Sequence, residues 1–379
     1  MVRKRKTQIL KDLELKIVFL TGPRQVGKTW LAQNIAKDFS HPVHLNYDSR
    51  SDREIILKEA WLPSTDLIIF DEIHKMPSWK GYIKGIFDTK LAKQKILVTG
   101  SARLEYFRQT GESLSGRVFT HRLFPFSVGE LSQAGFAMNT FDNGSSVLDR
   151  LINRSGFPEP FLAKDADFAQ RWRKQYVDGL IREDVLDFEK FSDFKSLKLC
   201  LELLKERTGS PISYASLSRD IGISPNTVKK YIQIFEELYI VFRVTPWTGG
   251  IARSIQKEPK IYFFDTALVE GDEGKKFENL TALALAKEAA AEEDLRGVSA
   301  ALHYIRTKDG REVDFCYAKN GKRQYFLEAK LSDPNISKNL RYFCERYNSP
   351  GIQLVKNIRK EYQEGIEVRS AEPWLRGLE

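Results

Sequence analysis

The first third of the chain alternates short apolar runs with amphipathic segments. Several of these runs are continuously apolar, which is the pattern of strands buried on both faces of a parallel sheet. Ser51 and Glu54 fit a capping box, which predicts a helix through Ala60 between two of the runs. The predicted strands lie at residues 17–20, 42–47, 67–70, 95–101 and 118–124. This alternation predicts an α/β domain with a parallel sheet.

The pattern changes after a polar linker at residues 139–146. Helical periodicity then continues to residue 207, and a strand at 261–265, a helix at 274–291 and a hairpin at 311–331 follow later. The domains expected from these changes are 1–138 (α/β), 147–207 (helical), 208–250 (helix-turn-helix) and 251–379 (α/β).

Composition narrows the class of protein. The chain has 379 residues, 42% hydrophobic and 29% charged, which is typical of a soluble globular protein with several domains. It contains no apolar run of membrane length and no secretory signal, so we expect a cytoplasmic protein without a membrane partner. Its 3 cysteines lack metal-binding spacing. The net charge of +9 favours a polyanionic partner, of which nucleic acid is the commonest, although a mildly basic protein without one fits the same number.

The sequence GPRQVGKT follows the first apolar run and precedes a predicted helix. This context is that of a phosphate-binding loop, in which glycines let successive N–H groups surround the phosphates of a nucleotide. Lys28 would reach the β- and γ-phosphates of ATP, and Thr29 would hold Mg²⁺. Arg24 could contact phosphate or point outward. The predicted nucleotide-binding residues are Gly22, Pro23, Arg24, Gln25, Val26, Gly27, Lys28, Thr29 and Trp30.

Two carboxylates, Asp71 and Glu72, end the apolar run at residues 67–70. In a doubly wound sheet the carboxyl ends of the strands meet at the ligand site. We therefore expect Asp71 to support Mg²⁺ and Glu72 to activate the attacking water. Arg117 precedes the last predicted strand and is a candidate for the arginine that stabilises the transferring phosphoryl group, within its own subunit or on a neighbour's nucleotide. A solvated surface arginine fits the same position.

These motifs resemble those of prokaryotic AAA+-like ATPases that carry a C-terminal domain of unknown function. The matching sequences are GPRQVGKT, LIIFDEIHK, VTGSA, LSGR, LFPFSVGEL and SGFPEPF. The resemblance implies a P-loop NTPase domain that hydrolyses ATP, a central helical region and a C-terminal module. It also implies that a polar residue after the 95–101 strand contacts the γ-phosphate and the lytic water. Either Ser101 or Thr99 could take that role, and either could be an ordinary strand cap.

A helix-turn-helix pattern covers residues 213–247. Gly222 separates two short helices, and Ser224 supplies the N-cap of the second. The strand that follows suggests a winged helix. Apolar residues line one face of the second helix, whereas Asn226, Lys229, Lys230 and Gln233 lie off it and would contact DNA. Winged helices also serve as packing or dimerisation modules, and that alternative stays open.

The C-terminal hairpin carries Asp314, Glu328 and Lys330. Glu328 and Lys330 project from one face of a strand. A two-residue turn at Asn320-Gly321 would place Asp314 on the opposite face, whereas a three-residue bulged turn would bring the carboxylates together. A catalytic site here therefore predicts the bulged turn.

This arrangement resembles the PD-(D/E)XK nucleases, which share a restriction-endonuclease-like α/β fold. By that resemblance Asp314 and Glu328 would hold Mg²⁺, with Glu278 as the acidic residue of the preceding helix, and Lys330 would act on a water. Val313 stands where the family usually has proline, which leaves nuclease activity less certain than the fold.

Three functions follow from these motifs. The first is an ATP-hydrolysing, DNA-engaging enzyme with a magnesium-dependent nuclease domain. The second is an ATP-driven DNA-binding or remodelling protein whose nuclease-like fold is catalytically silent. The third is a signalling ATPase that binds protein partners. Assembly as a homo-oligomer is compatible with all three.

Overall fold

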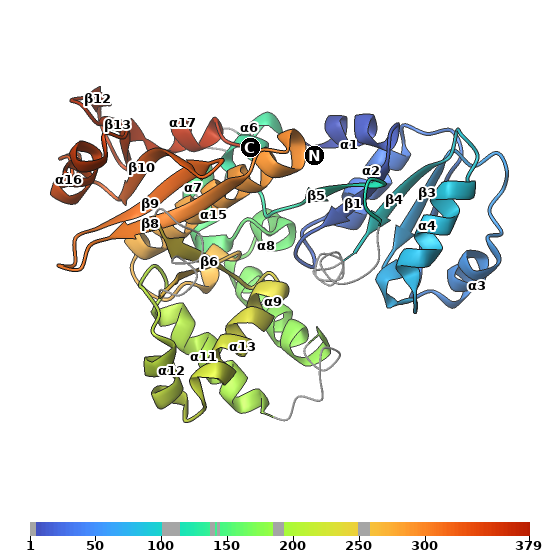
Figure 1. Ribbon diagram of the computed structural model, residues 1–379, viewed down its shortest axis with the longest axis horizontal. Helices are drawn as coiled ribbons and strands as arrows, with labels where there is room; N and C mark the ends of the chain where they lie inside the picture. Colours follow the sequence, from blue (N-terminus) through green and yellow to red (C-terminus); the bar gives the residue numbers. More distant parts are fainter. Residues whose placement is uncertain (1–4, 101–113, 137–140, 142–144, 185–192, 249–257) are drawn as a thin grey trace. The chain divides into compact units, whose positions relative to one another are not determined.

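The computed structural model describes residues 5–100, 114–136, 141, 145–184, 193–248 and 258–379 (Figure 1). The chain forms two compact units, Met1–Phe124 and Pro125–Glu379, which are considered separately. Among the described helices, none combines the length and the apolar composition that crossing a membrane requires.

The first unit is built around a five-stranded parallel sheet with the strand order β2-β3-β4-β1-β5. Its strands are β1 (Ile17–Thr21), β2 (Pro42–Asn46), β3 (Leu67–Asp71), β4 (Lys95–Thr99) and β5 (Val118–Arg122). Its helices are α1 (Lys6–Leu13), α2 (Lys28–Ala36), α3 (Arg50–Lys58), the 3-10 turn η1 (Ile73–Lys75) and α4 (Trp79–Thr89). The predicted α/β domain with a parallel sheet is confirmed.

The buried strands explain this sheet. Every residue of β1 and β3 is buried, as their continuous apolar runs predicted. Helix α3 begins slightly earlier than the capping box at Ser51 suggested. Ser49 is its N-cap and accepts a hydrogen bond from the Asp52 amide, because its extended backbone aims the hydroxyl at that N–H group.

The second unit contains an eight-stranded mixed sheet with the order β12-β13-β11-β10-β9-β8-β6-β7 (Figure 1). Its strands are β6 (Val241–Pro246), β7 (Lys260–Phe263), β8 (Ala300–Arg306), β9 (Glu312–Lys319), β10 (Lys322–Lys330), β11 (Gly351–Val355), β12 (Tyr362–Gln363) and β13 (Glu367–Ser370). Its longer helices are α7 (Val147–Arg154), α9 (Ala166–Gly179), α11 (Phe194–Glu206), α12 (Tyr214–Ile221), α13 (Pro225–Glu237), α15 (Glu273–Arg296) and α16 (Lys338–Tyr347). The shorter ones are α6 (Val128–Gln133), α8 (Pro158–Leu162), η2 (Leu180–Asp184), η3 (Thr266–Leu268) and α17 (Ala371–Arg376).

One hydrophobic core joins parts of this unit that the sequence suggested were separate domains. Leu151 of α7, Val244 of β6, Leu285 of α15 and Leu327 of β10 belong to the same buried cluster. Strand β6, expected as the wing of the helix-turn-helix, pairs with β7 and β8 and so becomes part of the large sheet.

The first unit also ends earlier than the expected boundary at residue 138, because α6 packs within the second unit. Glu130 of α6 forms a buried ion pair with Lys287 of α15. Gly129 of the same helix lies so close to the backbone near Leu378 that an added Cβ would be 2.8 Å from a carbonyl oxygen.

Candidate functional site

The phosphate loop between β1 and α2 has the backbone that its glycines predicted. Gly22, Gln25 and Gly27 have φ angles of +137°, +58° and +96°. Lys28 is buried, and its Nζ donates to the carbonyl oxygens of Gly22 at 3.0 Å and Pro23 at 2.6 Å. The ammonium group is thus held at the centre of the loop, where the phosphates of a nucleotide would lie.

A second contact fixes the start of this loop. A Cβ added to Gly22 would lie 2.2 Å from the carbonyl oxygen of Leu123, the residue that follows β5. Glycine is required here for two reasons. A Cβ would overlap the Leu123 carbonyl oxygen, and the φ angle of +137° lies outside the range that other residues readily adopt. The residue after β5 therefore packs directly against the start of the phosphate loop.

Asp71 connects the loop to the neighbouring strands. Its Oδ2 accepts a hydrogen bond of 3.0 Å from the Thr29 hydroxyl, and its Oδ1 accepts one of 2.5 Å from the buried Thr99 hydroxyl. His44 lies 3.5 Å from Oδ2. Burial alone raises the pKa of Asp71, but the nearby His44 and the hydrogen bonds from Thr99 and Thr29 outweigh it and hold the pKa below its usual value. Asp71 is therefore a carboxylate at neutral pH.

Glu72, next in the chain, has a different environment. Its backbone is left-handed, with a φ angle of +56°, and its amide donates to the Thr99 carbonyl. Oε2 lies 3.5 Å from Nε2 of His74 and is buried without a hydrogen bond from the described residues. Burial, followed by the charge of Asp71, raises the pKa of Glu72. A buried carboxylate with a raised pKa is suited to accept a proton.

This donor set fits a nucleotide bound with Mg²⁺. A lysine at the loop centre, a threonine hydroxyl and an ionised aspartate meet at the carboxyl edge of the sheet, where α2 begins. Thr29 and Asp71 would hold the ion, and Lys28 with the loop amides would hold the phosphates.

The remaining predicted residues of this unit lie in different places. Thr99 hydrogen-bonds Asp71, whereas Ser101 lies outside the described residues. Trp30 is 45% exposed on α2. Arg117 pairs with Asp88 through contacts of 2.9 and 3.2 Å just before β5 begins. Because β5 runs parallel to β1, Arg117 is at the edge of the sheet opposite the phosphate loop.

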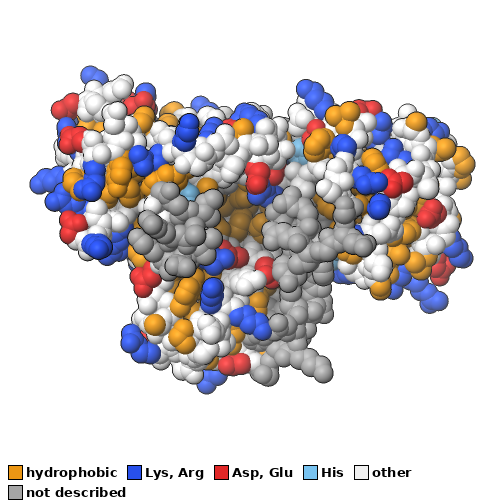
Figure 2. Space-filling view, viewed as in Figure 1, with side chains coloured by type: hydrophobic (Ala, Val, Ile, Leu, Met, Phe, Trp, Pro, Cys, Tyr) orange, Lys and Arg blue, Asp and Glu red, His pale blue; other side chains and the backbone are white. Residues whose placement is uncertain are grey.

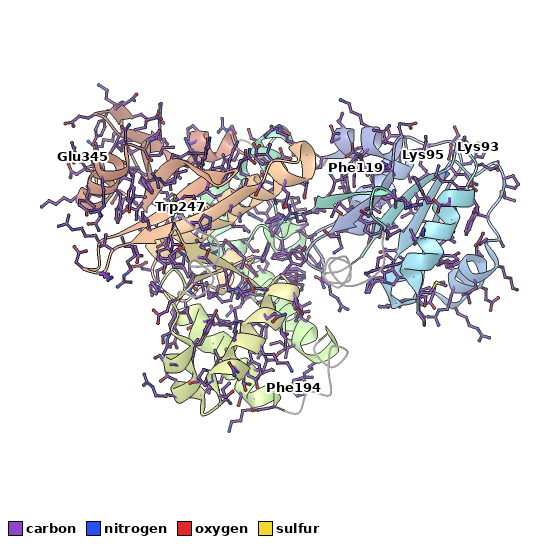
Figure 3. The ribbon with its side chains drawn as sticks, viewed as in Figure 1. Lys93, Lys95, Phe119, Phe194, Trp247 and Glu345 are labelled. Atoms are coloured by element: carbon purple, nitrogen blue, oxygen red, sulfur yellow. The ribbon has the colours of Figure 1, made fainter. Side chains whose placement is uncertain are left out.

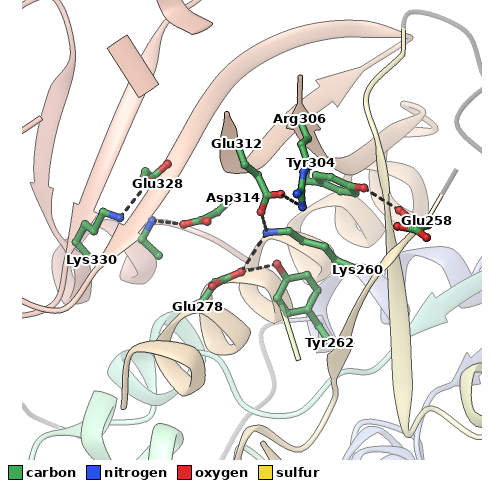
Figure 4. A network of polar contacts seen from close by, with 11 residues as sticks. Glu258, Lys260, Tyr262, Glu278, Tyr304, Arg306, Glu312, Asp314, Glu328 and Lys330 are labelled. Atoms are coloured by element: carbon green, nitrogen blue, oxygen red, sulfur yellow. Dashed lines mark hydrogen bonds and ion pairs between the residues drawn. The ribbon is translucent and has the colours of Figure 1, made fainter. Parts of the chain in front are cut away.

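The second predicted site lies in the large sheet of the C-terminal unit. Figure 4 shows that Glu278 of α15, Asp314 of β9, and Glu328 and Lys330 of β10 share one polar network. Lys330 Nζ lies 2.8 Å from Glu328 Oε1, and Asp314 Oδ2 accepts a hydrogen bond of 3.0 Å from the Ala329 amide. The structure brings the four residues of the D…ExK pattern together.

The prediction of a bulged turn in this hairpin is wrong. Lys319 pairs with Lys322 across a two-residue turn, and Asn320 and Gly321 have φ angles of +49° and +71°. A bulge further along β10 brings the two carboxylates back to the same face of the sheet. Gln324 is an extra residue between the paired positions Arg323 and Tyr325. From there the register places Asp314 opposite Glu328.

Lys260 of β7 is a member of this network that the sequence did not indicate. It is 1% exposed, and its Nζ lies 2.7 Å from Glu312 Oε1 and 3.6 Å from Glu278 Oε1. Tyr262, on the same strand, donates to Glu278 Oε1 at 2.7 Å. The only sequence signal was a lysine beginning a strongly apolar run, which on its own is unremarkable among surface lysines.

Charge is crowded in the network. Burial, with the charge of Asp314, raises the pKa of Glu278 to about 7 and that of Glu328 to about 7. The charges of Glu278, Asp314 and Glu312 outweigh the effect of burial on Lys260 and raise its pKa. The network therefore holds a charged lysine among carboxylates that compete for protons near neutral pH.

These residues do not form a ready magnesium site. Across the described part of the chain, no three histidine, cysteine or acidic side chains are grouped so as to hold a metal ion. Lys330 and Lys260 each occupy a carboxylate oxygen that would otherwise serve as a ligand. Oε2 of Glu328 is buried without a hydrogen bond from the described residues.

The helix-turn-helix has the expected local structure. Helix α12 ends at Gly222, whose φ angle is +81°, and the Ser224 hydroxyl caps α13 by accepting from the Thr227 amide at 3.1 Å. Val228, Tyr231, Ile232 and Phe235 are buried. The polar residues predicted to face outward are all exposed, namely Asn226, Lys229, Lys230 and Gln233.

Family models match successive parts of this chain. Residues 14–132 match a model described as an AAA domain. Residues 145–271 match a domain of unknown function (DUF8612), and residues 273–371 match another (DUF4143). The AAA match spans the phosphate loop, Asp71 and Glu72.

Curated relatives extend over most of the chain. An uncharacterized protein of Mycobacterium tuberculosis is 28% identical over 338 residues, covering 86% of this chain and 73% of the relative. An uncharacterized protein of Methanocaldococcus jannaschii is 24% identical over 377 residues, covering 90% and 82%. Neither name assigns an activity.

Solved structures show low similarity to the whole chain. A Walker-type ATPase of Pyrococcus abyssi has 15% identity and a TM-score of 0.45, covering 70% of this chain and 94% of that one. The RuvB Holliday junction branch migration motor of Thermotoga maritima has 17% identity and a TM-score of 0.32, covering 64% and 88%. The AAA match and the geometry of the sheet and loop carry the conclusion: the N-terminal unit has the fold of an AAA-type P-loop ATPase.

Proposed function

We propose that this protein binds and hydrolyses ATP in its N-terminal unit and engages DNA through its C-terminal unit. The observation that carries the first part is the hydrogen-bonded chain Thr29–Asp71–Thr99 beside the buried Lys28. It joins the phosphate loop to the ends of β3 and β4, where the γ-phosphate and its ion would lie.

Each of these residues has a separate role in the proposed reaction. Lys28 and the loop amides neutralise and orient the phosphates, while Thr29 and Asp71 would hold Mg²⁺, which would supply positive charge to the β- and γ-phosphates. Glu72 orients the attacking water and accepts its proton, since its buried carboxylate has a raised pKa. Thr99 positions Asp71 through its hydroxyl.

If Arg117 acts on a nucleotide, it acts between subunits. Its position at the far edge of the sheet and its pairing with Asp88 separate it from the phosphate loop of its own chain. In a homo-oligomer it could reach the nucleotide of a neighbouring subunit. Ser101 remains the alternative to Thr99 as the polar residue that contacts the γ-phosphate.

The ATPase proposal is tested with two variants and a control. Lys28→Ala should weaken ATP binding, as measured with a fluorescent ATP analogue, because it removes the cation at the loop centre. Glu72→Gln should keep that binding but lower kcat by about 10²- to 10⁴-fold, the usual contribution of a general base. Glu54→Gln removes an exposed glutamate of the same unit and should leave both unchanged. Full hydrolysis by Glu72→Gln would contradict the assigned role.

DNA engagement is supported by the exposed polar face of α13 and the net charge of +9. Replacing Lys229 and Lys230 with glutamate should weaken duplex binding at least tenfold at low salt, because phosphate contacts dominate such affinity. Lys195→Glu, on the exposed side of α11, is the charge control. Unchanged binding by the double variant would remove α13 from the proposal.

The carboxylate network supports a nuclease as the second candidate function. Asp314, Glu328 and Lys330 lie together on neighbouring strands, as the D…ExK pattern requires. Magnesium-dependent cleavage of DNA that disappears in Glu328→Ala and survives in Lys28→Ala would support it. Absence of cleavage with Mg²⁺ or Mn²⁺, with DNA binding intact, would favour a silent fold that only holds DNA. If nucleotide instead controls assembly with protein partners and no DNA is bound, the signalling alternative applies.

A further inference from the structure

Arginine and aromatic side chains alternate in one continuous row on the sheet and helix α16 of the C-terminal unit. The guanidinium carbon of Arg311 lies 4.4 Å from the ring centroid of Tyr342. That of Arg346 lies 5.7 Å from Tyr342 and 5.8 Å from Tyr347. That of Arg323 lies 4.6 Å from Tyr347 and 5.8 Å from Trp247. In order, the members are Arg311, Tyr342, Arg346, Tyr347, Arg323 and Trp247, and we call this row the arginine–aromatic ladder.

The ladder is assembled from distant parts of the sequence. Arg311 lies in the β8–β9 loop, the tyrosines belong to α16, and Arg323 belongs to β10. Trp247 follows β6 and is labelled in Figure 3. Figure 2 shows basic side chains around an apolar patch on this end of the unit.

The arginines are held by rings rather than by carboxylates. Arg346 donates to the Tyr342 hydroxyl at 2.5 Å, and Arg323 donates to the Ser349 hydroxyl at 3.4 Å. Within the described residues, neither forms an ion pair with an acidic side chain, and only Arg311 does, with Asp309 at 3.2 Å. A ring that supports the flat face of a guanidinium group leaves its N–H edge able to donate to phosphate.

Exposure and position fit a long anionic ligand. Arg311 and Arg346 are exposed, and the aromatic rings are half-buried. One end of the ladder, Arg311, is the chain neighbour of Glu312, which belongs to the carboxylate network through Lys260.

We propose that the arginine–aromatic ladder binds single-stranded nucleic acid. Its half-buried rings and exposed guanidinium groups can stack on bases while the guanidinium N–H edges contact phosphates. A duplex keeps its bases stacked on each other and offers none to the arginines, so the ladder prefers single strands. This inference specifies the DNA engagement proposed above and rests on it, but it involves neither α13 nor the ATPase site.

The experiment measures binding of a fluorescently labelled mixed-sequence single strand, and of the duplex of the same sequence, by anisotropy with the full-length protein. Arg323→Gln/Arg346→Gln should weaken single-strand binding about tenfold or more, given the usual contribution of one stacked base. The slope of log affinity against log salt should fall in magnitude by about 1.4, the value for two phosphate contacts on single strands. Duplex affinity should change less.

Arg323→Lys/Arg346→Lys separates stacking from charge. These variants keep both positive charges but lose the planar groups, so they should still weaken single-strand binding, whereas a purely electrostatic surface would bind as the wild type does. Arg341→Gln removes an exposed arginine of the same helix, for which the structure records no ring contact, and should change affinity less than twofold. Thermal unfolding of each variant checks that it folds.

The outcomes are distinct. The ladder proposal is overturned if the lysine variants bind like the wild type, if the glutamine variants do, or if single strands and duplex bind the wild type equally and lose affinity equally. Duplex binding that depends on Lys229 and Lys230 but not on the ladder would overturn this inference alone. No binding of any nucleic acid by the wild-type protein would overturn the proposed DNA engagement as well. ATP hydrolysis, measured in parallel, tests the ATPase proposal independently of both.

Discussion

Asp314 on β9 lies opposite Glu328 on β10, and the Ala329 amide donates to Asp314 Oδ2 at 3.0 Å. The single extra residue Gln324 makes this possible, since the two-residue turn alone would put the carboxylates on opposite faces of the sheet.

Deleting Gln324 should therefore disrupt the C-terminal unit. The deletion moves Glu328 and Lys330 to the face where Leu327 packs, so charged groups would enter the core at a cost of several kcal/mol. Urea unfolding should show this loss. Gln324→Ala is the matched control, because its exposed side chain bonds only the Lys322 carbonyl, and it should change the free energy of unfolding by no more than about 0.5 kcal/mol. Wild-type stability after the deletion would contradict the register described here.

Gly22→Ala should damage the phosphate loop. The new Cβ would overlap the Leu123 carbonyl oxygen, and the backbone has a φ angle of +137°. We expect destabilisation of the N-terminal unit by about 2 kcal/mol or more, together with loss of nucleotide binding. Gly81→Ala, in α4 with open space around it, should instead stabilise the unit by about 0.5–1 kcal/mol. The stability and the ATP binding of the two variants are measured by thermal unfolding with and without ATP. Equal effects of the two substitutions would contradict the requirement for glycine at position 22.

Thr99→Val should impair hydrolysis more than binding. The substitution keeps the shape but removes the hydroxyl that positions Asp71, and leaves a buried carboxylate with one fewer donor. We expect kcat to fall about tenfold with little change in KM, and stability to fall by about 1–3 kcal/mol. Thr99→Ser keeps the hydroxyl and should recover most of the activity. Wild-type activity in Thr99→Val would contradict the role assigned to the hydroxyl, and equal impairment by both would show that the methyl group matters as well as the hydrogen bond.

The pKa values of the carboxylate network predict a pH dependence of stability. The pKa of Glu328 is raised in the folded protein from 4.5 to about 7. A group whose folded pKa is raised stabilises the fold below its unfolded pKa, and this contribution is lost as the pH rises from about 4.5 to about 7.

Glu328→Gln cannot ionise, so it should be more stable than the wild type at pH 8, by on the order of 2 to 3 kcal/mol, and similar to it near pH 4.5. Chemical denaturation at both pH values measures the difference. Glu364→Gln, at an exposed position, should show no such dependence. A wild-type advantage at pH 8 would mean that the Lys330 ion pair outweighs burial.

Much of the N-terminal site could be predicted because it is encoded locally. Gly22, Lys28 and Thr29 are close in the chain, and the apolar run before Asp71 specifies a buried strand that ends at the ligand edge of a parallel sheet. The boundary of this unit was less predictable. Helix α6 continues the chain after β5, and contacts with residues far along the sequence, such as the ion pair of Glu130 with Lys287, assign it to the other unit.

The sequence by itself determined the phosphate loop, the carboxylates after β3 and the presence of the D…ExK residues, because covalent spacing and strand periodicity are local properties. Tertiary structure alone decided which of these residues meet. A bulge at Gln324, which no residue type announces, reverses the facing of every later side chain on β10. Lys260 enters the network, and Arg311, Arg323 and Trp247 join the tyrosines of α16, only because the fold packs segments far apart in sequence against one another.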